Sequence, residues 1–353
     1  MLNLLKPIVI GSTNLKNRII LAPLTRSRAV GEGRIPNSLM VDYYTQRAGA
    51  GLILTEATSV DPMGVGYANT PGIWSEQQIA GWSKITEAVH AKKGIVFMQL
   101  WHVGRVSDPI FLNGKTPVAP SAIAPTGHVS LLRPEKNYVT PRALLINEIK
   151  DVVEAFRLGA INAKIAGFDG VEIHSANGYL IDQFLHDGSN KRIDQYGGSI
   201  ENRSRLLLEI VDAVISVWGA DRVGVHLAPR GDSHDMHDSN PKKLFLSVVT
   251  ELAKKKIAFI FVREYQGVDS IGTELKKAFG GVYIANEKFT KETAETIIAN
   301  GDADAVSFGV PFISNPDLPM RFAENLPLNE TDFTTLYTDG AKGYTDYPLA
   351  TSN

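Results

Sequence analysis

The sequence contains no cysteine among its 353 residues. This absence excludes disulfide bonds, thiolate zinc sites, a cysteine nucleophile and iron–sulfur clusters held by cysteine. The sequence also lacks any apolar run long enough to span a bilayer. Its first residues have neither the apolar core nor the small-residue cleavage pattern of a signal peptide, so we expect a cytoplasmic protein.

Net charge is also nearly absent. The formal net charge of −2 gives no reason to expect nucleic acid or an anionic membrane as a partner. An apolar content of 44% and a charged content of 21% are those of an ordinary globular protein. The length exceeds that of most single domains, but α/β barrels often run this long, and we therefore interpret residues 1–353 as one domain.

Short apolar runs alternate with segments of helical periodicity along most of the chain. The expected barrel strands are 18–21, 52–57, 95–101, 170–174, 223–229, 258–264, 281–285 and 304–309. The expected helices are 38–48, 75–92, 145–166, 200–218, 241–256, 271–279 and 290–300, with a short helix after residue 315. A β-hairpin is expected at 8–16, a long insertion follows the third strand up to residue 141, and a loop is expected at 175–198.

This succession of βα units predicts an α/β protein with a (β/α)₈ TIM barrel. The near-continuous apolar character of the strands is typical of parallel pairing. An open doubly wound sheet is the competing architecture. It is disfavoured because no strand is followed by the glycine-rich turn that binds dinucleotides in such sheets.

The fourth expected strand ends in three polar side chains. His174 and Asn177 are able to contact one carbonyl or nitro oxygen, and Tyr179 offers a hydroxyl for proton transfer. The same triplet also fits a strand end with a capping Asn and a partly buried Tyr. The barrel favours a functional role, because active groups gather at the carboxyl ends of its strands. Those ends also hold Thr25, Ala57, Gln99, Trp101, His226 and Arg263.

The stretch 231–238 is rich in His and Asp, which are common metal ligands. Loops of this composition are more often solvated turns. We therefore expect no metal site there.

Five separated motifs carry a resemblance to a known family. They read APLTRSRA from residue 22, MQLWHVGR from 98, HSANGYLIDQFL from 174, YGGSIENRSR from 196 and GYTDYP from 343. In this order they resemble the old yellow enzyme family of FMN-dependent ene-reductases, and within it the bacterial N-ethylmaleimide and nitrate-ester reductases. The resemblance implies FMN as cofactor, NADPH or NADH as reductant, and activated alkenes such as enones and maleimides as substrates. Nitro compounds and nitrate esters are further candidate substrates.

The resemblance also assigns roles to residues. It implies that His174 and Asn177 bind the activating oxygen of the substrate and that Tyr179 donates a proton to the carbon that does not receive the hydride. The further residues implied to line the substrate pocket are Tyr67, Trp101 and Tyr344. Those implied to contact the cofactor are Pro23, Leu24, Thr25, Ala57, Gln99, His226, Ala285, Asn286, Phe308 and Gly309.

The chain departs from the family pattern at both ends of the expected cofactor. His226 stands where relatives carry an Arg at the flavin pyrimidine edge. Val310 stands in place of a phosphate-binding Arg, and Glu287 in place of a nearby glycine. Arg230 and Arg263 are candidates to supply the missing charge. Because His has an ordinary pKa near 6.5, we expect a partly charged His226 at neutral pH and a pH-dependent flavin potential.

Two rival functions remain at this point. One is a flavin-free barrel, such as a lyase or isomerase, which a colourless purified protein would favour. The other is a flavin-binding barrel without turnover. The presence of His174, Asn177 and Tyr179 argues against the second rival.

Overall fold

The computed structural model describes residues 2–350, and within them eight parallel strands close into a barrel. The strands in chain order are β3 (Ile19–Leu21), β4 (Leu52–Leu54), β6 (Val96–Trp101), β9 (Gly170–His174), β10 (Val223–Leu227), β11 (Phe259–Arg263), β12 (Val282–Asn286) and β13 (Ala305–Phe308). Each pairs with its neighbour in the chain, and β13 pairs with β3 to close the ring. A short strand, β5 (Thr58–Ser59), extends the pairing beyond the end of β4. The predicted (β/α)₈ barrel is confirmed.

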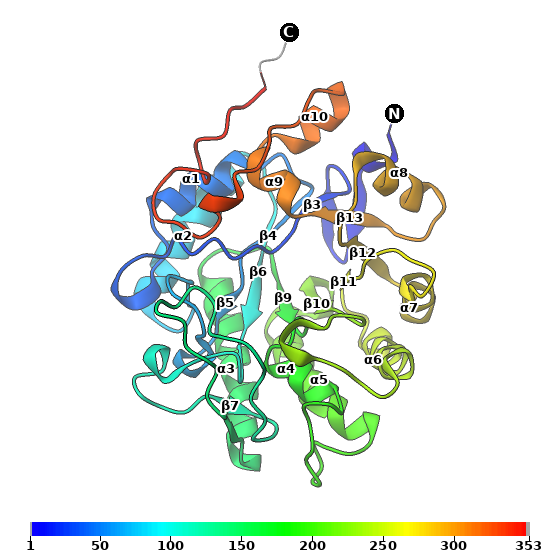
Figure 1. Ribbon diagram of the computed structural model, residues 1–353. Helices are drawn as coiled ribbons and strands as arrows, with labels where there is room; N and C mark the ends of the chain where they lie inside the picture. The colour runs from blue at the N-terminus through cyan, green and yellow to red at the C-terminus, as the bar shows by residue number, and fades with distance from the viewer. Residues whose placement is uncertain (1, 351–353) are drawn as a thin grey trace.

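Helices surround the strands, as Figure 1 shows. They are α1 (Ser38–Gln46), α2 (Glu76–Ala91), α3 (Ile146–Ile165), α5 (Ile200–Trp218), α6 (Pro241–Lys255), α7 (Gly272–Phe279), α8 (Lys291–Ala299) and α10 (Leu318–Glu324). Side chains fix several of their starts. Ser75 and Gln78 form a capping box at α2, and Ser199 caps α5. Within residues 2–350, none of the helices is both long and apolar enough to cross a membrane.

The N-terminal hairpin covers the amino end of the barrel. Its strands, β1 (Ile8–Ile10) and β2 (Thr13–Leu15), pair in antiparallel register. Ile10 and Leu15 are buried in an apolar cluster with barrel residues that include Phe97 and Phe259. This packing closes the bottom of the barrel, so that its other end is left for a site.

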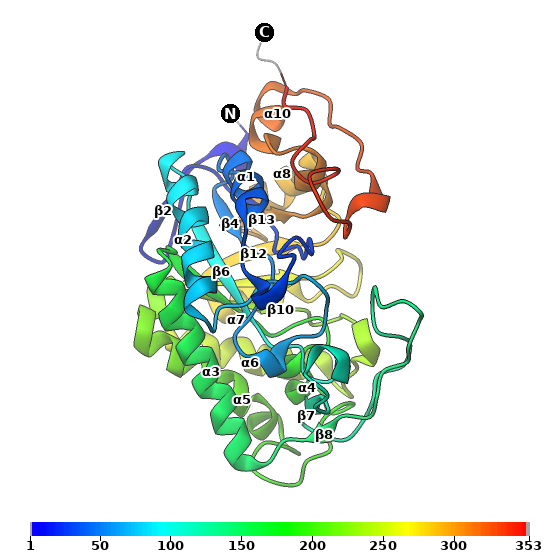
Figure 2. The same ribbon diagram turned by 90° about the vertical axis from the view of Figure 1, so that its left-hand side faces the viewer.

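The insertion after β6 has structure of its own, as its length suggested. It contains a 3₁₀ turn at Pro109–Phe111 and the strand β7 (Val118–Ala119), which pairs with β8 (Arg142–Ala143) beyond the insertion. In Figure 2 this insertion and the red C-terminal segment project from the same side of the barrel. Both therefore extend the wall around the carboxyl ends of the strands.

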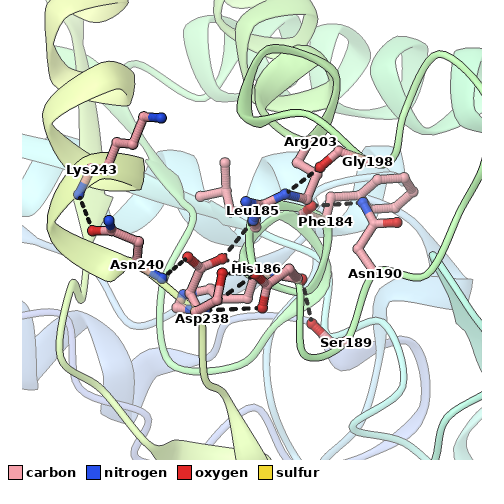
Figure 3. Close-up of polar contacts among 12 residues, drawn as sticks. Phe184, Leu185, His186, Ser189, Asn190, Gly198, Arg203, Asp238, Asn240 and Lys243 are labelled. Carbon is pink, nitrogen blue, oxygen red and sulfur yellow. Dashed lines mark hydrogen bonds and ion pairs between the residues drawn. The ribbon is translucent and has the colours of Figure 1, made fainter.

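The expected loop at 175–198 contains a helix instead, α4 (Leu180–Leu185), all of whose residues are buried. Six residues are too few to show helical periodicity, and tertiary contacts stabilise this turn. Arg203 donates to the backbone oxygens of Leu185 and Gly198 and pairs with Asp238 at 2.6 Å. Asn190 donates to the carbonyl oxygen of Phe184 at 2.8 Å (Figure 3). These contacts tie α4 to α5 and to the loop after β10. A second short helix, α9 (Val310–Ser314), was also not predicted.

Candidate active site

The carboxyl ends of the strands surround a cavity of about 670 Å³. This volume lies within the range of small-molecule sites. Seven of the residues predicted to belong to the site line it, namely Pro23, Leu24, Asn177, His226, Asn286, Phe308 and Gly309. They come from five different strands or their following loops, as expected for the active end of a barrel.

Five rings predicted to belong to the site pack together at or near this cavity. The Trp101 ring lies 5.6 Å from that of Tyr67 and 4.9 Å from that of Tyr179. The His174 ring meets Tyr179 edge-on at 5.0 Å and stacks on His226 at 4.9 Å. The structure therefore brings the predicted substrate-binding residues of β6, β9 and the loop after β5 into one group.

A tight turn after β9 places this group. Asn177 and Gly178 both adopt positive φ, at 56° and 78°. A Cβ at Gly178 would lie 2.6 Å from the carbonyl oxygen of Ser233, so glycine is required there. The Gly178 N–H donates to the Asp182 carboxylate at 2.8 Å, which anchors the turn to the first residues of α4. Tyr179 is consequently held at the start of that helix.

His174 is a neutral hydrogen-bond donor in this environment. Burial, together with the nearby charge of Arg263, lowers its pKa to about 3. Its Nδ1 accepts the backbone N–H of Ala176 at 3.3 Å. Because neutral imidazole carries one proton, that proton is on Nε2. His174 therefore presents an N–H donor.

Asn177 is oriented by an arginine. Its Oδ1 accepts a hydrogen bond from Nη1 of Arg263 at 2.9 Å, and Arg263 also pairs with the carboxylate of Glu287. Since an arginine has no acceptor atom, the amide oxygen must face it and the amide nitrogen must face away. Asn177 thus offers a second N–H donor.

Tyr179 remains protonated at neutral pH. Burial raises its pKa well above the ordinary value of 10, although a hydrogen bond with Tyr67 acts in the opposite direction. The two hydroxyl oxygens are 2.9 Å apart. A half-buried phenol with an intact proton is suited to general acid chemistry.

Beneath the cavity, Gln99, Glu172 and His226 form a buried hydrogen-bonded layer. The side-chain nitrogen of Gln99 lies 2.6 Å from Glu172 Oε2 and 3.1 Å from His226 Nδ1. Because Gln99 donates to Nδ1, the proton of a neutral His226 is on Nε2, and that atom is buried without a protein partner. Burial, then the proximity of His174 and Arg263, lowers the pKa of His226 well below 6.5. The prediction that His226 is partly charged at neutral pH is therefore wrong, and its side chain is a neutral hydrogen-bond donor.

Glu172 should make the stability of the protein depend on pH. Burial raises the pKa of its carboxyl to about 8. The folded state then holds this proton more tightly than the unfolded state, so its stabilising contribution is present at low pH and declines as the pH rises towards 8. Relative to wild type, Glu172→Gln should gain roughly 1 kcal/mol in free energy of unfolding per pH unit between about pH 5 and 8. Urea denaturation of both proteins at three pH values measures this gain, and parallel profiles would contradict it.

The cavity fits the expected FMN. An isoalloxazine ring is flat and has one polar edge, and the cavity presents two buried polar atoms without protein partners, His226 Nε2 and Ser307 Oγ. A cation, Lys288, lines the same cavity. The charge of Glu287, which would oppose a phosphate, is paired with Arg263.

Tyr344 is not with the other predicted substrate-binding residues. Its side chain is 0% exposed and its ring stacks on Tyr43 at 4.2 Å, under the guanidinium groups of Arg26 and Arg28. The prediction that Tyr344 lines the pocket is therefore wrong. Tyr337, which the sequence did not single out, lines the cavity in its place.

The remaining predicted residues lie close by without lining the cavity. Thr25 continues the segment of Pro23 and Leu24 and is half-buried. Ala57 packs in the apolar cluster of Trp101 and Tyr67. Ala285 is buried within β12. Of the two candidate arginines, Arg263 lines the cavity, whereas Arg230 pairs with Glu264 at 2.7 Å.

Sequence reasoning missed a set of buried arginines that hold the C-terminal segment over the site. Arg26 donates to the carbonyl of Gly343 at 2.8 Å, and Arg28 to that of Leu336 at 2.7 Å. Arg47 donates to the carbonyls of Phe312 and Ile313. Two of the three, Arg26 and Arg28, belong to the motif that begins at residue 22.

The His- and Asp-rich loop makes protein contacts. His234 Nδ1 lies 2.9 Å from the Asn177 carbonyl oxygen, and Asp235 accepts from the Thr126 hydroxyl at 2.6 Å. Among the described residues 2–350, no group of three or more His, Asp and Glu side chains is placed to hold a metal ion.

Comparisons with known proteins agree with this geometry. The sequence profile of the NADH:flavin oxidoreductase / NADH oxidase family matches residues 3–329. The probable flavin mononucleotide-dependent alkene reductase of Leishmania infantum is 42% identical, over 98% of this chain and 97% of its own. The old yellow enzyme homologue from Zymomonas mobilis superposes with a TM-score of 0.95 at 43% identity, over 98% and 99% of the two chains. Morphinone reductase in complex with tetrahydroNAD gives 0.94 at 44% identity, over 99% and 98%.

Proposed function

The chain belongs to the NADH:flavin oxidoreductase / NADH oxidase family, that of old yellow enzyme, and on this premise we propose what its site residues do. It is an FMN-dependent oxidoreductase that uses NAD(P)H to reduce the C=C bond of activated alkenes. When bound, FMN would supply the hydride chemistry between the nicotinamide and the activated alkene. The protein has to bind, orient and polarise the substrate.

His174 and Asn177 form an oxygen clamp. The observation that carries this role is the pair of N–H donors described above, each turned by a second contact, from Ala176 and Arg263 respectively. Hydride arrival at the β carbon places negative charge on the carbonyl or nitro oxygen. Two fixed donors in a buried site stabilise that charge, and removal of one such donor elsewhere costs about 3–4 kcal/mol.

Tyr179 is the proton donor to the α carbon. Its hydroxyl lies against Tyr67 and its ring against Trp101 and His174, so that it has a fixed position beside the clamp. Its raised pKa keeps the proton in place until the α carbon develops negative charge. Tyr67, Trp101 and Tyr337 form the walls around the substrate.

The residues that would hold the cofactor differ from the usual family pattern. Gln99 and the Nε2–H of His226 would serve the polar edge of the ring, beside the permanent charge of Arg263. Lys288, on the loop after β12, would serve the phosphate in place of the arginine that Val310 replaces. Pro23, Leu24 and Thr25 would lie along the ring.

The expectations on domain organisation, substrate range, location and partners remain proposals. We infer that residues 1–353 form one catalytic domain, and that nitro compounds and nitrate esters are further substrates beside enones and maleimides. A cytoplasmic location and the lack of a nucleic-acid partner stay predictions, which cell fractionation and the absorbance ratio of the purified protein test.

Spectroscopy of the purified protein tests the proposed function. We expect a yellow protein whose flavin band is bleached by NADPH or NADH in the absence of oxygen and restored by 2-cyclohexenone or N-ethylmaleimide. A protein that stays colourless after addition of FMN would support a flavin-free barrel. Bleaching without recovery on addition of any of these alkenes would support a flavin-binding protein without turnover.

A further inference from the structure

We propose that Arg263 and Glu287 form a positioning pair that fixes the amide of Asn177 and so sets the strength of the oxygen clamp. The inference rests on the proposed role of Asn177. It gives Arg263 and Glu287 a role in the reaction, in which they act on the substrate only through Asn177. Neither residue was assigned this role from the sequence.

The three side chains, which lie at or just after the ends of β9, β11 and β12, form a chain of contacts. Arg263 is the last residue of β11, and it lies in register with Asn286, the last residue of β12. Its Nη1 donates to Asn177 Oδ1 at 2.9 Å, while its Nε pairs with the carboxylate of Glu287. Asn177, Arg263 and Glu287 all line the large cavity. The chain therefore runs along the cavity wall.

The contact decides which way the Asn177 amide faces. A guanidinium has only donors, so the amide oxygen is drawn to it and the amide nitrogen is directed away. Without Arg263 the two orientations would differ little in energy, and the amide would present its oxygen to the substrate oxygen part of the time. Such an orientation repels the charge that the clamp is meant to stabilise.

The arginine also strengthens the donor. A charged donor on the amide oxygen polarises the group, so that its N–H bonds become better donors in a buried site. Arg263 itself is partly exposed, with a side chain 41% accessible, and would be free to turn without a second anchor. Glu287 supplies that anchor.

Glu287 occupies a backbone position that is unfavourable for its side chain. Its φ is 109°, in the left-handed half of the map, where residues other than glycine are strained. This conformation places the carboxylate beside Arg263. Phe261, two residues before Arg263, packs against His226 at 4.4 Å, so the strand that carries the arginine is fixed against the core.

A double-mutant cycle on the FMN-loaded protein tests the inference. The variants are Arg263→Met and Asn177→Ala, singly and together, and the readout is the dissociation constant of a para-substituted phenol, measured from its long-wavelength charge-transfer band. We expect Arg263→Met to weaken phenol binding by about 10- to 100-fold, as for loss of a hydrogen bond to a charged group. In the Asn177→Ala background the same change should alter binding by less than about twofold.

Companion variants keep the test decisive. Arg263→Lys retains the positive charge but not the planar guanidinium group. Glu287→Gln retains the arginine but weakens the contact that holds it. Each variant should therefore bind phenol with an affinity between those of wild type and Arg263→Met. Arg230→Lys, on the loop after the neighbouring strand, is the matched control and should bind phenol as wild type does. If Arg263→Met loses FMN, Arg263→Lys and Glu287→Gln in both backgrounds provide the cycle.

Two outcomes would overturn the inference, and they differ. Equal losses from the Arg263 change in both backgrounds would mean that the arginine acts on ligand or cofactor directly, with the clamp intact. Unchanged phenol binding in Asn177→Ala alone would remove Asn177 from the site, and the proposed clamp would fail together with this inference.

Discussion

Replacement of both His174 and Asn177 by alanine is expected to abolish enone reduction while FMN remains bound. Each side chain has an N–H donor group free of protein acceptors among the contacts described, and each is oriented by a protein contact on its other polar atom. Loss of one preorganised donor of this kind lowers a rate by about 10²–10³, and loss of both leaves nothing to stabilise the charge on the substrate oxygen. The reduction of the flavin by NAD(P)H should proceed, because it does not place charge on that oxygen.

The measurement separates the two half-reactions by stopped-flow absorbance. The variant should be bleached by the nicotinamide and should then fail to be reoxidised by an enone. It should also give no charge-transfer band with phenols. Ser175→Ala is a matched control, since Ser175 lies between the two residues, is buried, and donates only to the His226 carbonyl at 3.0 Å. A phenol titration of the double variant that follows wild type would show that the two donors do not meet the ligand.

The barrel was predictable because its determinants are local and repeated. Each buried strand is an apolar run, and each long helix shows its own periodicity, as with α5 and its cap at Ser199. The helix α4 was not predictable, because its six residues show no period and depend on Arg203, Asn190 and Asp238 from elsewhere in the chain. Its helical structure is a property of the packing.

Only the site residues that lie at or just after the end of a strand could be predicted from the sequence. His174, Asn177 and Tyr179 follow one strand directly, so the turn at Gly178 places them together. The position of the C-terminal segment cannot be predicted in this way, because it does not follow from the end of a strand. The segment is held by buried arginines from the opposite end of the sequence, and this packing buries Tyr344 and turns Tyr337 towards the cavity.

The electrostatics of the site depend on burial, which a sequence does not display. His226 was expected to carry part of a charge on the basis of its ordinary pKa. In the structure it is buried beside a second histidine and an arginine, and all three effects lower its pKa. A permanent charge, that of Arg263, lies on the next strand of the barrel.

Tyr179→Phe is expected to slow the alkene half-reaction by about 10²–10⁴, the usual contribution of general acid catalysis. The change removes one hydroxyl and keeps the ring contacts with Trp101 and His174, so binding should change little. Flavin reduction by NAD(P)H needs no proton from this residue and should keep its rate. Reduction of a nitro group, which takes its protons differently, should also suffer less.

Tyr67→Phe is the matched control, because it removes the other member of the hydroxyl pair, 2.9 Å away, and leaves the proposed donor in place. It should cost far less than Tyr179→Phe. The pH dependence provides an independent check: since burial raises the Tyr179 pKa above its ordinary value of 10, the wild-type alkene half-reaction should be flat from roughly pH 6 to 9. It should fall only as the pH approaches that raised pKa, where the phenol loses its proton. Equal losses in both half-reactions of Tyr179→Phe would mean that the hydroxyl serves packing, and that the proton comes from water.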